Sequence, residues 1–337
     1  MVRSALITGV GGQDGVHLAR FLIAQGYQVV GTVRSGHPDQ LRLAAYLDGV
    51  DVVEADVRDA AAMRRLIYEA RPDEVYNLAA LSSVGSSWVD EREVAEVNGV
   101  AVGRLLEVLL RYRDECGSAP RFFQASSAEI FGPAQAHPQT ERTPRQPLSP
   151  YGLAKLTAHE TATRFRDRYG LHVSNGILFN HESPLRHPRF VIRKISQAAA
   201  ALATGGSADL ALGTLEIRRD WGAAADVVRA MWLMLQQDVP DDYVIATGVS
   251  TSLRQLAEIA FAVAGFDDPW RFVREDPAIE RPMDPPQLWG DATHAREILG
   301  WVPGRTLTDV MKEMVEADIE RLRRGVAESP DLLSGRT

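Results

Sequence analysis

The first 180 residues alternate short runs of apolar and β-branched residues with longer segments whose apolar positions recur at helical spacing. Runs of the first kind predict β-strands, and segments of the second kind predict amphipathic helices. We expect strands at residues 4–8, 28–32, 52–55, 74–78, 121–125 and 172–178, and helices at residues 15–25, 60–70, 97–113 and 150–169. Such alternation predicts βαβ units, in which helices cover both faces of a parallel sheet.

Beyond residue 180 the pattern is less regular, with helices expected at residues 190–204, 226–236, 253–264 and 307–323 and a strand at residues 242–246. Residues 277–286 are rich in proline, which lacks the backbone N–H, so this stretch is expected to be irregular. The predicted fold class is therefore α/β: a Rossmann-type doubly wound parallel sheet over residues 1–180, to which residues 223–250 return, and a smaller α/β C-terminal lobe over residues 181–330. Residues 331–337 are expected to form a frayed tail.

Composition excludes several classes of protein. The 337 residues are 45% hydrophobic and 24% charged, and the net charge of −8 argues against nucleic acid or an anionic membrane as the main partner. With Cys116 as the single cysteine, neither an intrachain disulfide nor a thiolate zinc site can form, and the eight histidines show no close ligand spacing, so no metal is expected. No apolar stretch approaches the roughly 18 residues that span a bilayer, and the N-terminal apolar run is too short for a signal peptide. We therefore expect a cytoplasmic protein.

Three glycines follow the first predicted strand at G-x-x-G-x-x-G spacing: Gly9, Gly12 and Gly15. Such a turn lets the backbone approach a pyrophosphate, which then lies on the free N–H groups of a helix N-terminus. The alternative is a plain glycine-rich turn between a strand and a helix. The position of the motif at the very start of the fold favours a dinucleotide.

The end of the second strand selects the cofactor. NAD-binding proteins usually place an acidic residue there for the ribose 2′-hydroxyl, whereas this chain has Arg34, which suits a 2′-phosphate. NADP is therefore favoured, although Arg34 would otherwise be an ordinary loop arginine. Asp56 and Val57 follow the third strand, where they would face the adenine, but an aspartate there is also a common helix cap.

A serine, a tyrosine and a lysine indicate hydride chemistry. Ser127 follows a predicted strand, and Tyr151 and Lys155 lie four residues apart on one face of a predicted helix. An ammonium near a phenol is expected to lower the phenol pKa, so that Tyr151 accepts a hydroxyl proton while hydride leaves the same carbon. A Y-x-x-x-K pair is common by chance, but its combination with the glycine turn and the serine is not.

The motifs resemble the extended short-chain dehydrogenase/reductase family of sugar-nucleotide enzymes, and within it the GDP-mannose 4,6-dehydratase branch, over nearly the whole chain. The stretches that carry the resemblance are GVGGQDG (9–15), YNLAA (76–80), QASSAEIFG (124–132), SPYGLAK (149–155), NGILFNHESP (175–184), RDWG (219–222) and AMWLMLQ (230–236). The resemblance implies a lyase of nucleotide-sugar metabolism and deoxysugar biosynthesis.

Glu129 distinguishes the subclasses of that family. A 4-epimerase needs only the serine, tyrosine and lysine, whereas a dehydratase must also take a proton from C5 and expel the C6 hydroxyl. Glu129 stands two residues beyond Ser127, where the dehydratase pattern has its glutamate; the alternative is a surface glutamate in a turn. The implied cycle is oxidation at C4, elimination across C5 and C6, and return of the hydride to C6, giving GDP-4-keto-6-deoxy-mannose and water.

The resemblance also implies the ligand contacts, each of which has an ordinary solvated or structural side chain as its alternative. The implied cofactor contacts are Gly9, Gly12, Gln13, Asp14, Gly15, Arg34, Asp56, Val57, Leu78, Ala79, Ala80, Ser82, Tyr151, Lys155, His181 and Arg186. The implied substrate contacts are Ser82, Asn180, Lys194, Arg219, Arg281 and Asp284, with the three basic residues along the diphosphate and Asp284 at the guanine.

Departures from the family pattern bear on the substrate and the assembly. Ser127 stands where the pattern has threonine, Ala128 where it has serine, Ser83 where it commonly has histidine, and Leu185 where it often has arginine. The alternatives therefore remain a dehydratase for another GDP-sugar such as a heptose, a C4 epimerase, or a non-catalytic NADP-binding sensor. A homodimer through the helices at residues 97–113 and 150–169 is expected, or a homotetramer through the loop around Arg34.

Overall fold

The computed structural model describes residues 2–36, 42–133, 137–279 and 283–333. Within these ranges a parallel sheet runs in the order β10-β6-β5-β4-β1-β2-β3. Its strands are β1 (Ser4–Thr8), β2 (Gln28–Val33), β3 (Val50–Glu54), β4 (Glu74–Asn77), β5 (Arg121–Ser127), β6 (Val173–Leu178) and β10 (Asp242–Ile245). The chain order reverses at β1, which pairs with both β2 and β4. In a doubly wound sheet, ligands bind beyond the carboxyl ends of the strands at such a reversal.

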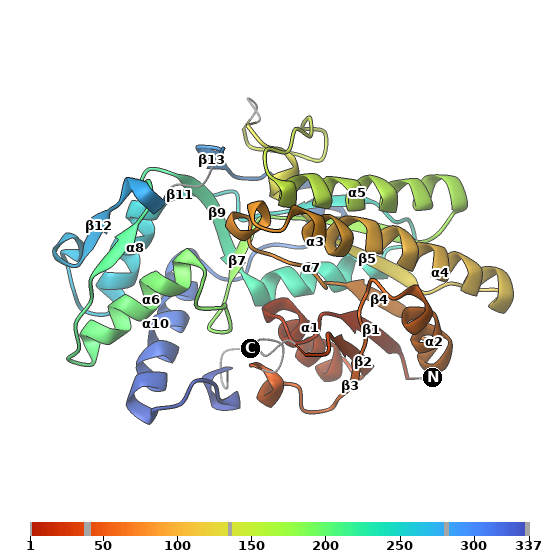
Figure 1. Cartoon of the computed structure of the whole chain (residues 1–337), viewed down its shortest axis with the longest axis horizontal. Coiled ribbons are helices and arrows are strands. Elements are labelled where there is room, and N and C mark those ends of the chain that lie inside the picture. Colours follow the sequence, from red (N-terminus) through yellow and green to blue (C-terminus); the bar gives the residue numbers. More distant parts are fainter. Residues whose placement is uncertain (1, 37–41, 134–136, 280–282, 334–337) are drawn as a thin grey trace.

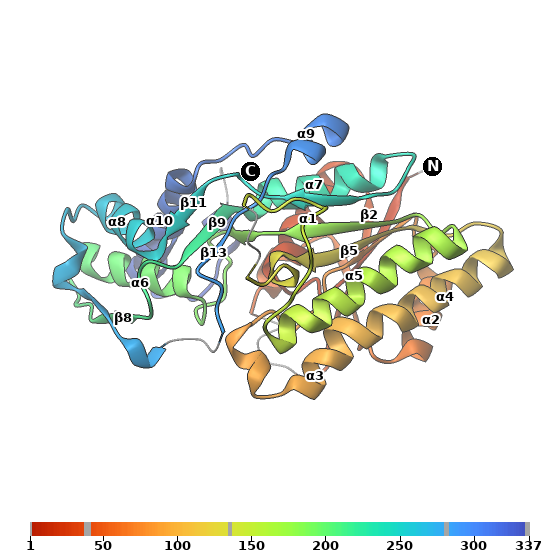
Figure 2. The ribbon, with the colours of Figure 1, turned by 90° about the horizontal axis from the view of Figure 1, so that it is seen from above.

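Helices cover both faces of this sheet (Figure 2). Apolar residues of α1 (Gln13–Ala24), α7 (Ala224–Gln236) and α9 (Thr293–Leu299) fill the core on one face. The other face packs against α2 (Ala60–Ala70), α4 (Ala101–Cys116) and α5 (Pro150–Tyr169). The helix predicted at residues 97–113 begins earlier, because α3 (Glu91–Ala95) continues through a π-helical turn, η4 (Glu96–Val100), into α4. The expected Rossmann-type α/β fold class is confirmed.

A smaller lobe lies beside this sheet (Figure 1). It contains α6 (Val191–Ala203), α8 (Leu253–Val263) and α10 (Leu307–Arg324), which share a core with Trp221 and Val273. Its strands are β7 (Asn180–Glu182), β8 (Leu210–Leu212), β9 (Arg218–Ala223), β11 (Ser250–Ser252), β12 (Val273–Glu275) and β13 (Gln287–Leu288). In sequence these strands are only two to six residues long, which is too short for a clear hydrophobic period.

Short helical turns complete the fold: η2 (Ala44–Tyr46), η3 (Gly85–Trp88), η5 (Ala128–Ile130), η6 (Pro269–Arg271), η7 (Pro277–Ile279) and η8 (Pro330–Leu333). Two of them correct the sequence analysis. Residues 277–286 were expected to be irregular, but residues 277–279 form η7. Proline is tolerated there because the first turn of a helix does not need its N–H. The tail expected from residue 331 is wrong for residues 331–333, because Leu332 and Leu333 are buried; residues 334–337 lie outside the described ranges. The assignment of residues to two domains stays a prediction.

In the described part of the chain, no helix is long and apolar enough to cross a membrane. The same residues contain no group of three or more His, Cys, Asp or Glu side chains that could hold a metal ion.

Candidate active site

The turn between β1 and α1 is packed too closely for side chains at two of its glycines. A Cβ on Gly9, whose φ is +71°, would lie 2.8 Å from the Cα of Ala79, and a Cβ on Gly15 would lie 2.6 Å from the Val10 carbonyl oxygen. A Cβ on Gly12 would meet only the Gly9 oxygen, at 3.4 Å. The first N–H groups of α1 have no partner within the helix. The turn is therefore a cradle that fits the pyrophosphate of a dinucleotide.

An ion pair joins this cradle to the small lobe. The Asp14 carboxylate lies 2.8 Å from Nε2 of His181, whose Nδ1 lies 2.7 Å from the Phe179 carbonyl oxygen. Both ring nitrogens thus face acceptors, which suits the protonated imidazolium. Burial opposes this charge, but Asp14 outweighs it and raises the pKa of His181. Burial likewise opposes ionisation of Asp14, but His181 holds its pKa well below the usual range.

The residues predicted for the adenosine end lie at the ends of β2 and β3. Nη1 of Arg34 is 2.8 Å from a carboxylate oxygen of Glu93 in α3. Asp56 is bound through both oxygens by Arg58, whose hydrogen bond lowers the pKa of the Asp56 carboxyl. The Val57 side chain is buried in the core that contains α2, and its contact with the adenine stays a prediction. Arg34 is thus held by an acidic neighbour that the sequence did not indicate.

A cavity of about 730 Å³ lies beyond the carboxyl ends of β4, β5 and β6 and extends into the small lobe. All four predicted catalytic residues line it: Ser127, Glu129, Tyr151 and Lys155. Of the other predicted contacts, Asp14, Leu78, Ala80, Ser82, Asn180, His181, Arg186, Lys194, Arg219 and Asp284 also line it. Gly9, Gly12, Gln13, Gly15, Arg34, Asp56, Val57 and Ala79 lie outside its lining.

Local sequence places the predicted catalytic residues at two adjoining chain turns. Ser127 ends β5, and its Oγ accepts a hydrogen bond of 3.2 Å from the N–H of Glu129 as the cap of η5. Ser149 caps α5 through the N–H of Gly152, which puts Tyr151 in the first helical turn. A Cβ on Gly152 would lie 2.6 Å from the Glu129 carbonyl oxygen. Glycine at this position therefore lets the tyrosine and glutamate turns touch.

Electrostatics around the tyrosine differ from the expectation. Lys155 Nζ donates a 2.9 Å hydrogen bond to the Ala125 carbonyl oxygen and lies 5.8 Å from the centre of the Tyr151 ring. Burial raises the pKa of Tyr151 to about 12, against the hydrogen bond from Ser127, which lowers it. Burial lowers the pKa of Lys155 to about 8. The predicted lowering of the Tyr151 pKa by Lys155 is therefore wrong for the protein by itself, because desolvation of the phenolate is the larger effect.

The predicted substrate contacts are brought together, but two of them bind each other. Arg219 is buried, forms an ion pair with Asp284 and donates to the Pro285 carbonyl oxygen at 3.0 Å. The sequence had suggested separate roles for Arg219 at the diphosphate and Asp284 at the base. Lys194 is an exposed residue of the cavity wall. Arg281 lies outside the described residues.

Sequence reasoning missed Glu182, a buried carboxylate of the cavity wall. Its Oε2 lies 2.9 Å from Nε of Arg186, and the Arg186 guanidinium lies over the ring of Phe190 at 3.8 Å. Burial raises the pKa of Glu182, while Arg186 opposes that change. The sequence feature that could have indicated Glu182 is its position two residues after Asn180, because residues two apart in a strand lie on the same side of it.

Comparison with known proteins agrees with this geometry. Residues 6–314 match the family model described as GDP-mannose 4,6 dehydratase. The chain is 42% identical to GDP-mannose 4,6 dehydratase 2 of Arabidopsis thaliana, over 95% of this chain and 88% of that protein. It is 42% identical to GDP-mannose 4,6-dehydratase of Sinorhizobium fredii, over 95% and 97%, and 40% identical to the human GDP-mannose 4,6 dehydratase, over 95% and 92%.

Solved structures show the same fold. A UDP-glucose 4-epimerase of Thermotoga maritima with UDP-glucose superposes with a TM-score of 0.82 at 26% identity, covering 96% of this chain and 99% of that one. RMD from Pseudomonas aeruginosa complexed with NADPH superposes with a TM-score of 0.78 at 21% identity, covering 95% and 99%. From the family match and the near full-length relatives, the chain belongs to the GDP-mannose 4,6-dehydratase family.

Proposed function

We propose that this protein is an NADP-dependent nucleotide-sugar 4,6-dehydratase that converts GDP-mannose to GDP-4-keto-6-deoxy-mannose and water. The observation that carries the proposal is the position of Glu129, which lines the same cavity as Ser127 and Tyr151. A carboxylate at that point supplies the acid/base function that a C4 epimerase does not need. The glycine cradle and the Asp14–His181 pair support a dinucleotide at the neighbouring end of the cavity.

The turn at Gly9, Gly12 and Gly15 would hold the pyrophosphate of the cofactor, and Arg34 would bind its 2′-phosphate. Oxidised NADP would supply the hydride acceptor for oxidation at C4 and, once reduced, the hydride donor for C6, together with a positive charge that would favour the phenolate of Tyr151. NADP rather than NAD follows from Arg34 and from the absence of an acidic residue directly after β2.

The protein residues move the protons. Ser127 holds the C4 hydroxyl, and Tyr151 takes its proton as the C4–H bond gives up hydride. The resulting C4 ketone acidifies the C5 proton, which Glu129 removes, and the protonated carboxyl assists departure of the C6 hydroxyl as water. Hydride then adds to C6 and C5 takes a proton from solvent, while Tyr151 releases the C4 hydroxyl proton to solvent, so that both catalytic groups regain their starting state. Lys155, held by the Ala125 carbonyl, adds positive charge near the phenolate. No net oxidation occurs.

Other features of the proposal rest on the sequence. A cytoplasmic location follows from the lack of an apolar span. A homodimer through α4 and α5, or a tetramer that also uses the Arg34 loop, remains proposed. Turnover of a different GDP-sugar, a C4 epimerase and a non-catalytic sensor are the competing functions.

Mass spectrometry separates these functions. Purified protein is incubated with GDP-mannose and a catalytic amount of NADP in deuterated water. We expect loss of one water from the sugar nucleotide and one solvent deuterium at C5. An unchanged mass in ordinary water with altered sugar stereochemistry would establish an epimerase instead, and turnover of another GDP-sugar alone would reassign the substrate. Bound coenzyme with no turnover of any sugar nucleotide would support the sensor.

Glu129→Gln is the informative variant, because amide nitrogen and oxygen keep the side-chain volume while removing the base. We expect C4 oxidation without elimination, so that reduced nicotinamide accumulates to about one equivalent of enzyme and the sugar loses no water. Tyr151→Phe is the matched control, in which neither reduced nicotinamide nor product forms. Normal dehydration by the Glu129→Gln variant would remove Glu129 from the proposed mechanism.

A further inference from the structure

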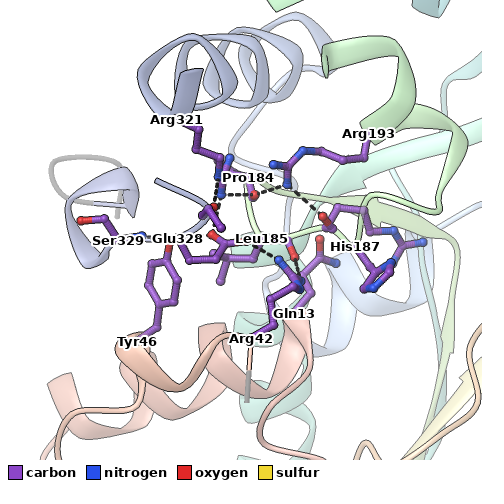
Figure 3. Close-up of polar contacts among 12 residues, drawn as sticks. Gln13, Arg42, Tyr46, Pro184, Leu185, His187, Arg193, Arg321, Glu328 and Ser329 are labelled. Atoms are coloured by element: carbon purple, nitrogen blue, oxygen red, sulfur yellow. Dashed lines mark hydrogen bonds and ion pairs between the residues drawn. The ribbon is translucent and has the colours of Figure 1, made fainter. Parts of the chain in front are cut away.

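Three arginines hold one short segment, residues 184–186, through its backbone (Figure 3), and Arg186 of this segment lines the cavity. Arg193 donates to the carbonyl oxygens of Pro184 and Arg186, at 2.6 and 2.9 Å. Arg321 donates to Pro184 at 2.8 Å, and Arg42 donates to the Leu185 carbonyl oxygen at 2.6 Å. Three successive carbonyls, 184–186, are therefore fixed by guanidinium groups.

These arginines come from distant parts of the chain. Arg42 lies beyond β2 in the large sheet domain, whereas Arg193 belongs to α6 and Arg321 to α10 of the small lobe. Asp318 accepts hydrogen bonds from Arg193 and from Arg321, at 2.6 and 3.1 Å. Asp318 therefore offsets one of the two positive charges on the lobe side of the arrangement.

Glu328 joins the two sides. Its Oε1 forms an ion pair with Arg42, and its Oε2 accepts from Arg321 at 2.7 Å and from the Tyr46 hydroxyl at 3.0 Å. The Glu328 side chain is 9% exposed. Such charge-assisted bonds are strong, and loss of one partner leaves the remaining charges unpaired in a partly desolvated place. The Glu328 carboxylate therefore connects the sheet domain, the small lobe and the segment that leads into the C-terminal turn η8. The next residue, Ser329, also donates its backbone N–H to the Tyr46 hydroxyl.

The held segment is anchored to the glycine turn on its other side. Gln13 donates to the His181 carbonyl oxygen at 3.0 Å and accepts from the Ser183 hydroxyl at 3.0 Å. The stretch 181–186 that these contacts hold includes His181, Glu182 and Arg186, which line the cavity. Displacement of the segment would move these charges relative to the cradle at α1.

We propose that Glu328 is a positioning residue: acting through Arg42 and Arg321, it fixes the segment 183–187 so that His181 and Arg186 meet a phosphate-bearing ligand in the cavity. The identity of that ligand as NADP rests on the proposed function above. The site of action lies far from Glu328 in sequence, and Glu328 itself is not part of the cavity lining. Its effect is therefore expected on ligand binding more than on the chemical step.

The test compares Glu328→Gln with Asp331→Asn. Both variants remove one negative charge from the C-terminal turn, but Asp331 pairs at 3.5 Å with an exposed arginine, Arg324, away from the held segment. The first measurement, hydrogen–deuterium exchange of peptides that cover residues 183–187, requires no ligand. We expect faster exchange in Glu328→Gln and wild-type exchange in Asp331→Asn.

The second measurement is the NADPH dissociation constant from nicotinamide fluorescence, with the GDP-mannose KM and kcat. For Glu328→Gln we expect about tenfold weaker NADPH binding, the size of one lost charge-assisted contact, with kcat changed less than about threefold. Arg42→Gln removes the ion pair between Arg42 and Glu328 from the sheet side, and we expect it to weaken NADPH binding in the same way. The effects of the two substitutions in the double variant should be less than additive, because both variants lose the shared contact between Glu328 and Arg42.

Wild-type exchange in Glu328→Gln would overturn the proposal, and so would faster exchange with unchanged NADPH affinity. An additive double variant would equally overturn it. If wild-type protein binds NADPH but does not dehydrate GDP-mannose, the proposed function fails, while the exchange and affinity measurements still decide the role of Glu328.

Discussion

Replacing Gly152 by alanine tests how strictly the tyrosine and glutamate turns must fit together. The added Cβ would lie 2.6 Å from the Glu129 carbonyl oxygen and 3.0 Å from Cβ of Pro147. The first contact is with backbone, so the start of α5 or the η5 turn must move by about half an ångström. Overpacking of this kind costs about 1–3 kcal/mol of unfolding free energy.

Activity should fall by more than stability does. The displacement separates Tyr151 from Glu129, and misplacement of reacting groups by about 1 Å costs about 10²-fold in rate. We therefore expect Gly152→Ala to lower kcat by about 10- to 100-fold with little change in the GDP-mannose KM. Thermal unfolding and steady-state dehydration assays measure the two effects.

Gly103→Ala is the matched control, since it is also a helical glycine and its Cβ would meet only the Thr161 methyl group, at an ordinary 3.6 Å. It should keep kcat and gain up to about 1 kcal/mol from helix propensity. A Gly152→Ala variant with wild-type kcat would refute the argument that this contact sets the geometry of the site, whatever its stability.

Two further predictions concern buried charges. Asp318→Ala leaves Arg193, which is 2% exposed, without its carboxylate, so urea unfolding should show a loss of about 3–5 kcal/mol; a loss below about 1 kcal/mol would contradict a buried ion pair at this position. Pairing with Asp14 raises the pKa of His181 above 6.5, the value expected in the unfolded chain. Protonated His181 therefore contributes its full stabilisation below pH 6.5, and this contribution disappears as the pH rises through the raised pKa. His181→Gln should remove that pH-dependent part of the unfolding free energy, and an identical pH profile in wild type and variant would show that the pair contributes nothing.

Local sequence determined much of the architecture. Apolar periodicity located β1, β2, β5, β6, α5 and α10 to within a few residues, because the strands are buried in continuous apolar runs and each helix buries one apolar face. The positions of Gly9, Ser127, Tyr151 and Lys155 in the fold were predictable because they depend on fixed spacing within a turn or one helical face. The family resemblance added Glu129, and the cavity contains it beside Tyr151.

Tertiary structure decided what depends on partners that are distant in the chain. The pairing of Arg219 with Asp284, and of Arg34 with Glu93, arises from contacts that no sequence period encodes. Burial, which is a property of the whole fold, raises the Tyr151 pKa against the expectation from Lys155. Residues 331–333 were expected to belong to a tail because so few residues show no pattern, but Leu332 and Leu333 are buried. Glu328, just before them, meets Arg42, a residue 286 positions away. Sequence thus fixes which groups are available, whereas long-range packing and desolvation determine which of them meet and in what charge state.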